Sequence, residues 1–162
     1  MSKLIIIRGP LGIGKTTIAK KLAEELSAKY ISIDKILEES GLDKEDNNFT
    51  PDDFIKANKI VLPSIKENLQ KGKIIILDGC FYFKEQIEHL EKNLPFKSYI
   101  FTLKAPIEVC IERDKKRKKV YGEKEAREVY KLVSKFDCGI IINTENMSVN
   151  QVIKEIKDFL EK

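Results

Sequence analysis

Residues 9–16 read Gly-Pro-Leu-Gly-Ile-Gly-Lys-Thr and match the pattern G-x-x-x-x-G-K-[ST] at every fixed position. The segment follows a β-branched run, Leu4–Ile7, and precedes an apolar stripe with helical spacing over residues 16–29. Glycines let backbone N–H groups point inward around an anion, and a helix N-terminus adds its positive dipole end. The pattern therefore predicts a phosphate-binding loop between a strand and a helix. The alternative is a glycine-rich turn that contains an incidental lysine.

The predicted loop would bind the phosphates of ATP. Lys15 is expected to bridge the β- and γ-phosphate oxygens, and Thr16 is expected to offer its hydroxyl to Mg²⁺. The residues expected to bind the nucleotide are Gly9, Leu11, Gly12, Ile13, Gly14, Lys15, Thr16, Thr17 and Arg113.

Short apolar runs alternate with amphipathic stretches along the whole chain. The expected strands are 4–7, 30–33, 73–78, 98–103 and 139–143, and the expected helices are 16–29, 34–39, 51–70, 84–93, 106–119, 123–135 and 148–160. Strict alternation of strand and helix favours a parallel sheet that is covered on both faces. We therefore predict an α/β fold of three layers, α-β-α, with a five-stranded parallel sheet and a small helical lid over about 113–127. Residues 1–162 are expected to form one domain.

Composition limits the possible classes further. The chain has 162 residues, a formal net charge of +4 and three cysteines without a C-x-x-C pair, so neither a disulfide framework nor a zinc site is expected. The longest apolar runs have four residues, which is too short for a signal peptide or a membrane span. We expect a cytoplasmic protein with no membrane partner. The mild charge permits an anionic substrate without demanding nucleic acid.

Among P-loop proteins, the GTPase motifs D-x-x-G and N-K-x-D are absent, and the chain lacks the length and further motifs of ABC and AAA+ ATPases. It resembles the small P-loop kinases with a nucleoside-monophosphate-kinase-like sheet, and within them the adenylylsulfate-kinase-like, gluconate-kinase-like and polynucleotide-kinase-like domains. The resemblance rests on the P-loop, ISID at 31–34, IIILDGCFY at 74–82, LKAPIEVCIERDKKRKKVYG at 103–122 and IIINT at 140–144. It implies a kinase that uses ATP and Mg²⁺. The D-G-D-N-x-R element of adenylylsulfate kinases is absent.

Two acids follow expected strands at the edge where ligands bind in open α/β sheets. In the resembling kinases, an acid at the position of Asp34 accepts the proton of the attacking hydroxyl or holds the substrate; otherwise Asp34 caps a helix. Many polynucleotide kinases of this group carry an arginine three residues further on, where this chain has Leu37. Asp78 has the pattern of a Walker-B acid that binds Mg²⁺ together with Thr16, or it is the base if Asp34 only binds substrate. It could also be a simple turn residue.

Only four of the 30 basic residues are arginines, and Arg113, Arg117 and Arg127 lie within fifteen residues of one another. They resemble the lid of these kinases, in which arginines close over the phosphates, and an arginine offers a planar fork that lysine lacks. Arg113 and Arg117 are expected to share one helix face as catalytic residues, one against the adenine and the other at the transferred phosphoryl group. The alternative is a solvated basic face. Arg8 would pair with a buried acid or cap its strand.

The expected activity is transfer of the γ-phosphoryl group of ATP to a hydroxyl of a small molecule or nucleotide-like acceptor, with Lys15, Asp34, Arg113 and Arg117 as catalytic residues. One alternative is a 5′-hydroxyl polynucleotide kinase, in which the basic run 113–119 and the rings at 81–83 bind nucleic acid. Another is a non-catalytic module gated by ATP. The aromatic residues at 81–83 either form a wall of the acceptor site or pack in the core. Loops at 40–56 and 79–87 are expected to select the acceptor, whose identity stays open, as does the oligomeric state.

Overall fold

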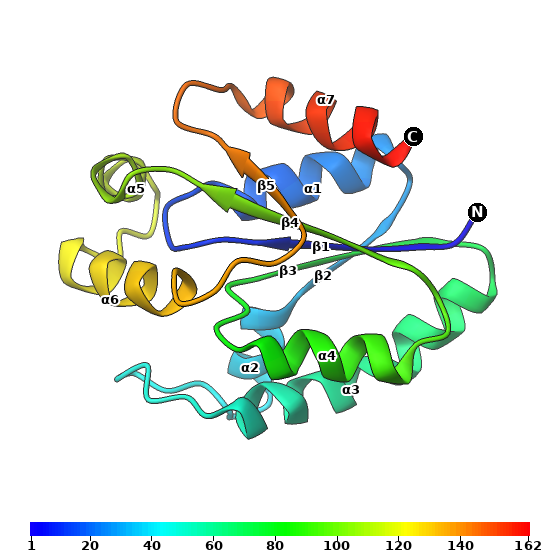
Figure 1. The fold of residues 1–162 in the computed structure, drawn as a ribbon. Helices are drawn as coiled ribbons and strands as arrows, with labels where there is room; N and C mark the ends of the chain where they lie inside the picture. The colour runs from blue at the N-terminus through cyan, green and yellow to red at the C-terminus, as the bar shows by residue number, and fades with distance from the viewer.

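The computed structural model describes all of residues 1–162 and contains one five-stranded parallel sheet (Figure 1). The strands are β1 (Lys3–Arg8), β2 (Lys29–Ser32), β3 (Ile74–Gly79), β4 (Ser98–Lys104) and β5 (Ile140–Asn143), in the order β2-β3-β1-β4-β5. The predicted α/β class and the five-stranded parallel sheet are confirmed.

The central strand β1 fixes where the ligand-binding edge lies. Its Ile and Leu side chains are buried because β1 lies in the middle of the sheet, between β3 and β4, and helices cover both faces (Figure 1). Arg8, at the end of β1, is in register with Gly79 of β3 and Thr102 of β4. The glycine loop after β1 and the acids after β2 and at the end of β3 therefore meet at one edge of the sheet.

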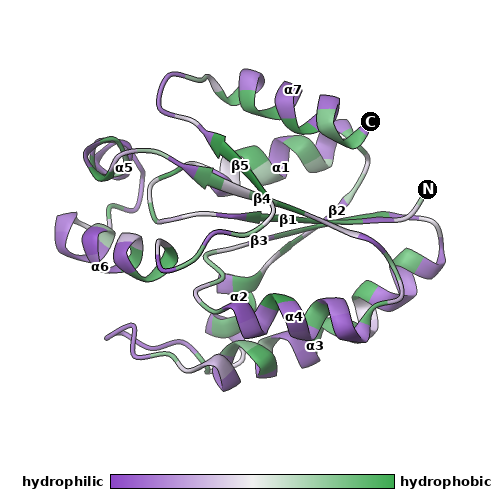
Figure 2. Ribbon diagram, in the orientation of Figure 1, coloured by the Kyte–Doolittle hydropathy of each residue, from purple (hydrophilic) through white to green (hydrophobic).

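Seven helices accompany the sheet: α1 (Lys15–Glu25), α2 (Ile33–Glu39), α3 (Pro51–Gln70), α4 (Lys84–Asn93), α5 (Ile107–Lys115), α6 (Glu123–Val133) and α7 (Val149–Leu160). Helices α1 and α7 cover one face, and α2, α3 and α4 cover the other (Figure 1). Figure 2 shows that the hydrophobic sides of these helices face the sheet. Side chains of α6 join the same core as α3 and α4, which places α6 beside that layer. No helix is long and apolar enough to cross a membrane.

Three helices end earlier than their apolar patterns predict. Helix α1 ends at Glu25 instead of residue 29. Two residues later, Ser27 takes a positive φ of 50°, and the chain turns into β2. Helix α5 stops at Lys115 instead of residue 119, and α6 ends at Val133 instead of residue 135.

The early end of α5 has a clear physical cause. The buried carboxylate of Asp114 accepts backbone N–H groups from Tyr121 and Gly122, at 3.2 and 2.9 Å. These bonds fold residues 116–122 back towards α5, and they compete with continuation of the helix. The predicted lid is therefore two helices joined by a turn that Asp114 holds.

Candidate active site

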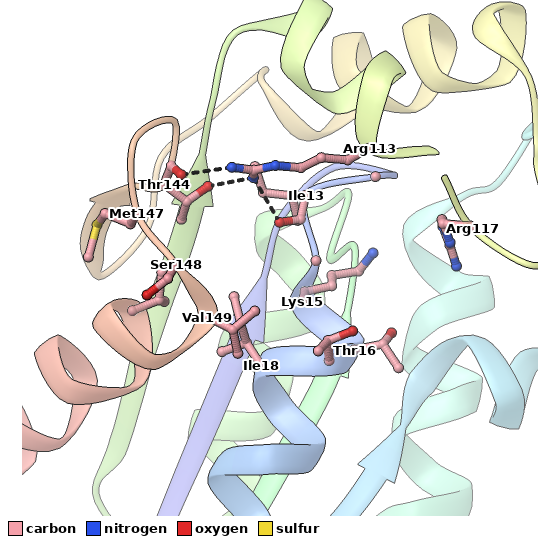
Figure 3. Close-up of a pocket in the computed structure, with 14 residues that line it drawn as sticks. Ile13, Lys15, Thr16, Ile18, Arg113, Arg117, Thr144, Met147, Ser148 and Val149 are labelled. Carbon is pink, nitrogen blue, oxygen red and sulfur yellow. Dashed lines mark hydrogen bonds between the residues drawn. The ribbon is translucent and has the colours of Figure 1, made fainter. Parts of the chain in front are cut away.

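The glycine loop curves around a cavity of about 420 Å³ (Figure 3). Gly12 and Gly14 have φ values of +82° and +93°, which L side chains rarely adopt. A Cβ on Gly12 would lie 2.2 Å from the carbonyl oxygen of Cys110, so α5 packs directly on the loop. The cavity is lined by Gly12, Ile13, Gly14, Lys15, Thr16, Thr17, Ile18, Arg113, Arg117, Thr144, Met147, Ser148, Val149 and Val152. Gly9 and Leu11 lie outside this lining; Gly9 is buried against Ile13 and Leu103.

Lys15 is buried at the junction of two cavities, since it also lines a second cavity beside the first. Burial by itself lowers the pKa of Lys15, but the surrounding negative charges outweigh it, and the pKa is raised overall. The Cys80 thiol contributes only when ionised, and its own pKa is raised to about 11 by burial. At neutral pH, Asp34 and Asp78 therefore keep the lysine charged. This ammonium is suited to neutralising phosphate oxygens.

Asp78 lies at the end of β3 and is 2% exposed, and only one of its two carboxylate oxygens accepts hydrogen bonds. Its Oδ2 accepts hydrogen bonds from the Thr16 hydroxyl at 2.9 Å and from the Tyr30 hydroxyl at 2.7 Å. Its Oδ1 is buried and has no partner in the protein. An unpartnered carboxylate oxygen beside a threonine hydroxyl fits Mg²⁺, which binds through few protein oxygens and keeps several waters.

Asp34, in the first turn of α2, has no hydrogen bond or ion pair, in contrast to Asp78. It is exposed to solvent within the second cavity, where surrounding protein removes part of its hydration. This desolvation raises the pKa of Asp34; Lys15 opposes the shift, and Asp78 adds to it. Asp34 lines the second cavity, whereas Asp78 lines neither cavity. A free carboxylate of raised basicity therefore faces the space next to Lys15.

The second cavity has a volume of about 280 Å³ and lies between α2, the loop after it and the lid. It is lined by Leu11, Lys15, Asp34, Leu37, Glu38, Asp43, Lys44, Glu45, Asn47, Phe49, Phe54, Cys80, Tyr82, Lys119, Tyr121, Glu125 and Val129. We call it the acceptor cavity. No arginine lines it, and Leu37 stands where the polynucleotide kinases mentioned above carry one.

The expected pairing of Arg113 and Arg117 on one helix face is wrong, because α5 ends before Arg117. Arg113 donates to the carbonyl oxygen of Ile13 at 3.2 Å, and to the hydroxyl and carbonyl of Thr144 at 3.0 and 2.8 Å. It therefore ties the glycine loop to the segment after β5 (Figure 3). Arg117 is exposed, lies apart from Arg113 in Figure 3, and contacts the Tyr121 ring and the Asp114 carboxylate. Arg113 thus braces the cavity wall, while Arg117 lines the same cavity from the turn after α5.

The other two arginines are also placed by the structure. Arg127 forms an exposed ion pair with Glu123 at 2.8 Å and lines neither cavity, so it does not fold back to the phosphates. Arg8 is fully buried and pairs with no acid.

Arg8 instead binds groups from three parts of the chain. It donates to the carbonyl oxygens of Phe81, Val133 and Phe136 and to the Thr102 hydroxyl. Phe81 has a positive φ of 50°, and the bond from Arg8 helps to hold that strained backbone. Of the three aromatic residues in this segment, Phe81 packs in the core, Tyr82 lines the acceptor cavity, and Phe83 packs against Phe54.

Comparisons with known proteins agree with this geometry. Residues 4–136 match the family described as AAA domain. The chain belongs to this family. The short length of the chain argued against an AAA+ ATPase, so this family name differs from the expectation. However, the curated relatives reported below are kinases.

A cytidylate kinase of Saccharolobus islandicus is 29% identical over 97% of this chain and 90% of its own length. A cytidylate kinase of Sulfurisphaera tokodaii is 30% identical over 97% and 94%. Among solved structures, a sugar kinase from Janibacter superposes with a TM-score of 0.83 at 18% identity, covering 99% of this chain and 95% of that one, which bears on the fold alone. The protein is thus a P-loop kinase, a phosphotransferase that acts on a small molecule.

Sequence reasoning missed several residues of this kinase site. Tyr30 was part of an expected strand and carried no motif, although a polar hydroxyl in an edge strand is a usable signal. The segment Met147–Val152 completes the first cavity, and nothing in its composition marks it. Glu125 and Lys119 line the acceptor cavity on either side of Gly122, whose backbone N–H the Asp114 carboxylate binds. Such contacts depend on tertiary structure.

Proposed function

We propose that this kinase transfers the γ-phosphoryl group of ATP, with Mg²⁺, to a hydroxyl group of a small molecule that brings no phosphate into the acceptor cavity. The observation that carries the proposal is the Asp34 carboxylate, which is unpartnered, lines the acceptor cavity and lies close enough to Lys15 to influence its pKa. A hydroxyl needs a base at this position, whereas a phosphate acceptor is already ionised and needs none.

The glycine loop and Lys15 would bind the β- and γ-phosphates in the first cavity. Thr16 and Asp78 would hold Mg²⁺, which supplies charge neutralisation for the phosphate oxygens when bound. Asp34 would orient the acceptor hydroxyl and take its proton as the oxygen attacks phosphorus. The new P–O bond forms while the bond between the γ-phosphorus and the β–γ bridging oxygen breaks, so ADP leaves with that electron pair. Asp78 is unsuited as the base because it is engaged by two hydroxyls and lines neither cavity.

The lining of the acceptor cavity argues against a phosphate-bearing acceptor. Phosphate groups are bound best by arginine forks, and this cavity has none. Leu37 presents an apolar side chain instead. Five carboxylates face three lysines, and one of those lysines, Lys15, is needed for ATP. A dianionic monophosphate would enter a cavity of net negative charge.

The second candidate is a nucleoside monophosphate kinase. It is favoured by the two cytidylate kinases, which resemble the chain over nearly its whole length. For this activity the lysines at positions 44 and 119 would have to bind the acceptor phosphate, although Lys44 already pairs with Asp53 at 2.9 Å. A 5′-hydroxyl polynucleotide remains an acceptor to test because residues 115–119 are basic.

The test offers γ-labelled ATP and Mg²⁺ with CMP, AMP, nucleosides, sugars, amino alcohols, adenylylsulfate and a 5′-hydroxyl oligonucleotide. Lys15→Ala is the control for loop-dependent transfer. We expect transfer to an unphosphorylated alcohol, and a loss of about 10²-fold or more in kcat for Asp34→Asn. Turnover of CMP or AMP that exceeds all alcohols and survives Asp34→Asn would refute the proposal in favour of the second candidate.

A further inference from the structure

We propose that Arg8 is a positioning residue for the kinase reaction. Its guanidinium fixes two walls of the acceptor cavity relative to each other, and it thereby determines how tightly the acceptor binds. The inference rests on the proposed function in taking this cavity as the place of the acceptor, and it applies to an alcohol and to a phosphate acceptor alike.

Arg8 is a buried cation whose placement opposes folding. The side chain is fully buried, no carboxylate pairs with it, and its Nε has no hydrogen-bond partner. Burial lowers the pKa of Arg8, but an arginine keeps its charge inside proteins. A methionine would fill a similar space without burying a charge or an unsatisfied N–H group. Packing alone therefore does not require an arginine at this position.

One bond of Arg8 holds the cavity wall that follows β3. Its Nη2 donates to the carbonyl oxygen of Phe81 at 3.2 Å, and Phe81 has the positive φ of 50° that residues with a side chain rarely adopt. Such strain persists only where the surroundings hold the residue in place. Cys80 and Tyr82, the two neighbours of Phe81 in the chain, both line the acceptor cavity. The Arg8 bond therefore fixes the backbone between two side chains of the wall.

The same nitrogen holds a second wall, which belongs to α6. Nη2 of Arg8 also donates to the carbonyl oxygen of Val133, the last residue of α6, at 3.0 Å, and Nη1 donates to that of Phe136 at 3.3 Å. The last carbonyls of a helix have no partner within it, and a cation is stabilised at this end of the helix dipole. Glu125 and Val129 of the same helix line the acceptor cavity. One guanidinium thus joins α6 to the wall after β3.

A lysine does not reproduce this arrangement. Two nitrogens of a planar group reach the Thr102 hydroxyl and three carbonyl oxygens from separate parts of the chain, whereas a lysine has one nitrogen. Arg8 directly precedes Gly9, but its side chain makes no hydrogen bond to the glycine loop and lines neither cavity. A substitution of Arg8 is therefore expected to weaken acceptor binding and to leave nucleotide binding nearly unchanged.

Thiol labelling reports on the wall after β3 without requiring a known acceptor. Cys80 lines the acceptor cavity and is 7% exposed, whereas Cys110 is fully buried on α5, where its carbonyl faces Gly12 of the glycine loop. The variant Arg8→Lys is treated with N-ethylmaleimide in the presence of Mg²⁺ and a non-hydrolysable ATP analogue, and peptide mass spectrometry follows each cysteine. We expect labelling of Cys80 to accelerate about tenfold or more, and that of Cys110 to change by less than about threefold. An unchanged rate at Cys80, or equal acceleration of both cysteines, would overturn the inference.

Two further variants separate wall positioning from a general loss of stability. Thr102→Val is the matched control, because it removes a buried partner of Arg8 that lines neither cavity. It should lower the Tm and leave the Cys80 rate near that of wild type; a rate equal to that of Arg8→Lys would contradict the assignment. Arg8→Met removes every bond of the guanidinium and should accelerate Cys80 at least as much as Arg8→Lys. If Arg8→Met does not fold, Arg8→Lys decides the question, since it keeps the charge.

Kinetics complete the test with the compound that is phosphorylated fastest in the transfer assay. In Arg8→Lys, the KM for that acceptor is expected to rise about tenfold or more, while the KM for ATP stays within about twofold of wild type. An equal rise in both KM values, or an unchanged acceptor KM, would refute the role of Arg8. This result is separate from the proposed function, which depends on whether the best acceptor is an alcohol or CMP.

Discussion

Replacing Tyr30 by phenylalanine removes one hydroxyl that donates to the Asp78 carboxylate at 2.7 Å. The ring is retained, so packing against β3 and the Lys20 side chain over the ring is preserved. Asp78 keeps a single donor, the Thr16 hydroxyl at 2.9 Å. The substitution therefore isolates one hydrogen bond to a carboxylate that is 2% exposed.

The magnitude follows from the partners of that bond. Hydrogen bonds to charged groups contribute roughly 1.5–3 kcal/mol, and the low end applies because Tyr30 is only half-buried and Asp78 Oδ2 retains a second donor. A loss of about 1.5 kcal/mol in the free energy of unfolding corresponds to a Tm lower by about 3–6 °C for a domain of this size. The Asp78 carboxylate also loses one of the two hydrogen bonds that orient it. We therefore expect the Mg²⁺ concentration at half-maximal ATP binding to rise severalfold.

The assay combines thermal unfolding without nucleotide and calorimetric titration of ATP at fixed Mg²⁺ concentrations. Tyr99→Phe is the control, since the Tyr99 hydroxyl has no hydrogen-bond partner in the structure. It should leave both readouts near wild type. If Tyr30→Phe changes neither the Tm nor the Mg²⁺ dependence, the Tyr30 hydroxyl does not hold Asp78, and the metal role of Asp78 loses its structural support.

Three further predictions test other parts of the site. Lys15→Ala should abolish phosphoryl transfer in an activity assay while circular dichroism remains that of wild type. Gly12→Ala should weaken ATP binding at least tenfold in calorimetry, because its Cβ would lie 2.2 Å from the Cys110 carbonyl oxygen at a φ of +82°; unchanged affinity would contradict the tight packing of α5 on the loop. The pKa of Asp34 is raised in the folded protein, so its ionisation costs stability progressively as the pH rises from the unfolded value of about 4 through the higher folded value. Asp34→Asn should therefore raise the Tm at pH 7, an advantage that disappears below about pH 4 in a series of melting curves.

Local patterns sufficed for the fold and for the position of the glycine loop. Gly12 and Gly14 adopt positive φ values, and glycine is the residue type that adopts such values most readily, so the residue types alone indicate this loop. Strand alternation likewise placed Asp34 and Asp78 at one edge of the sheet, because parallel strands share their carboxyl ends. These inferences needed no knowledge of tertiary contacts.

The lid shows where such patterns stop being sufficient. The spacing of Arg113 and Arg117 fits one helix face, and the sequence between them contains no helix breaker. The helix ends because Asp114 is buried and its carboxylate binds backbone N–H groups seven and eight residues later. An intrinsically helical segment was thus overridden by one buried carboxylate, which no periodicity reveals.

The different roles that we propose for Asp34 and Asp78 also follow from their surroundings. Asp34 and Asp78 are the same residue type at equivalent strand ends, so sequence leaves their roles interchangeable. Two hydroxyls orient the buried Asp78 carboxylate and leave its Oδ1 without a partner in the protein, which suits this group to holding Mg²⁺. Asp34 has no donor and faces the acceptor cavity, which raises its pKa and leaves it free to take a proton. If Tyr30→Phe loosens Asp78 while Asp34→Asn stabilises the fold and stops turnover, the difference between metal ligand and base lies in these neighbours.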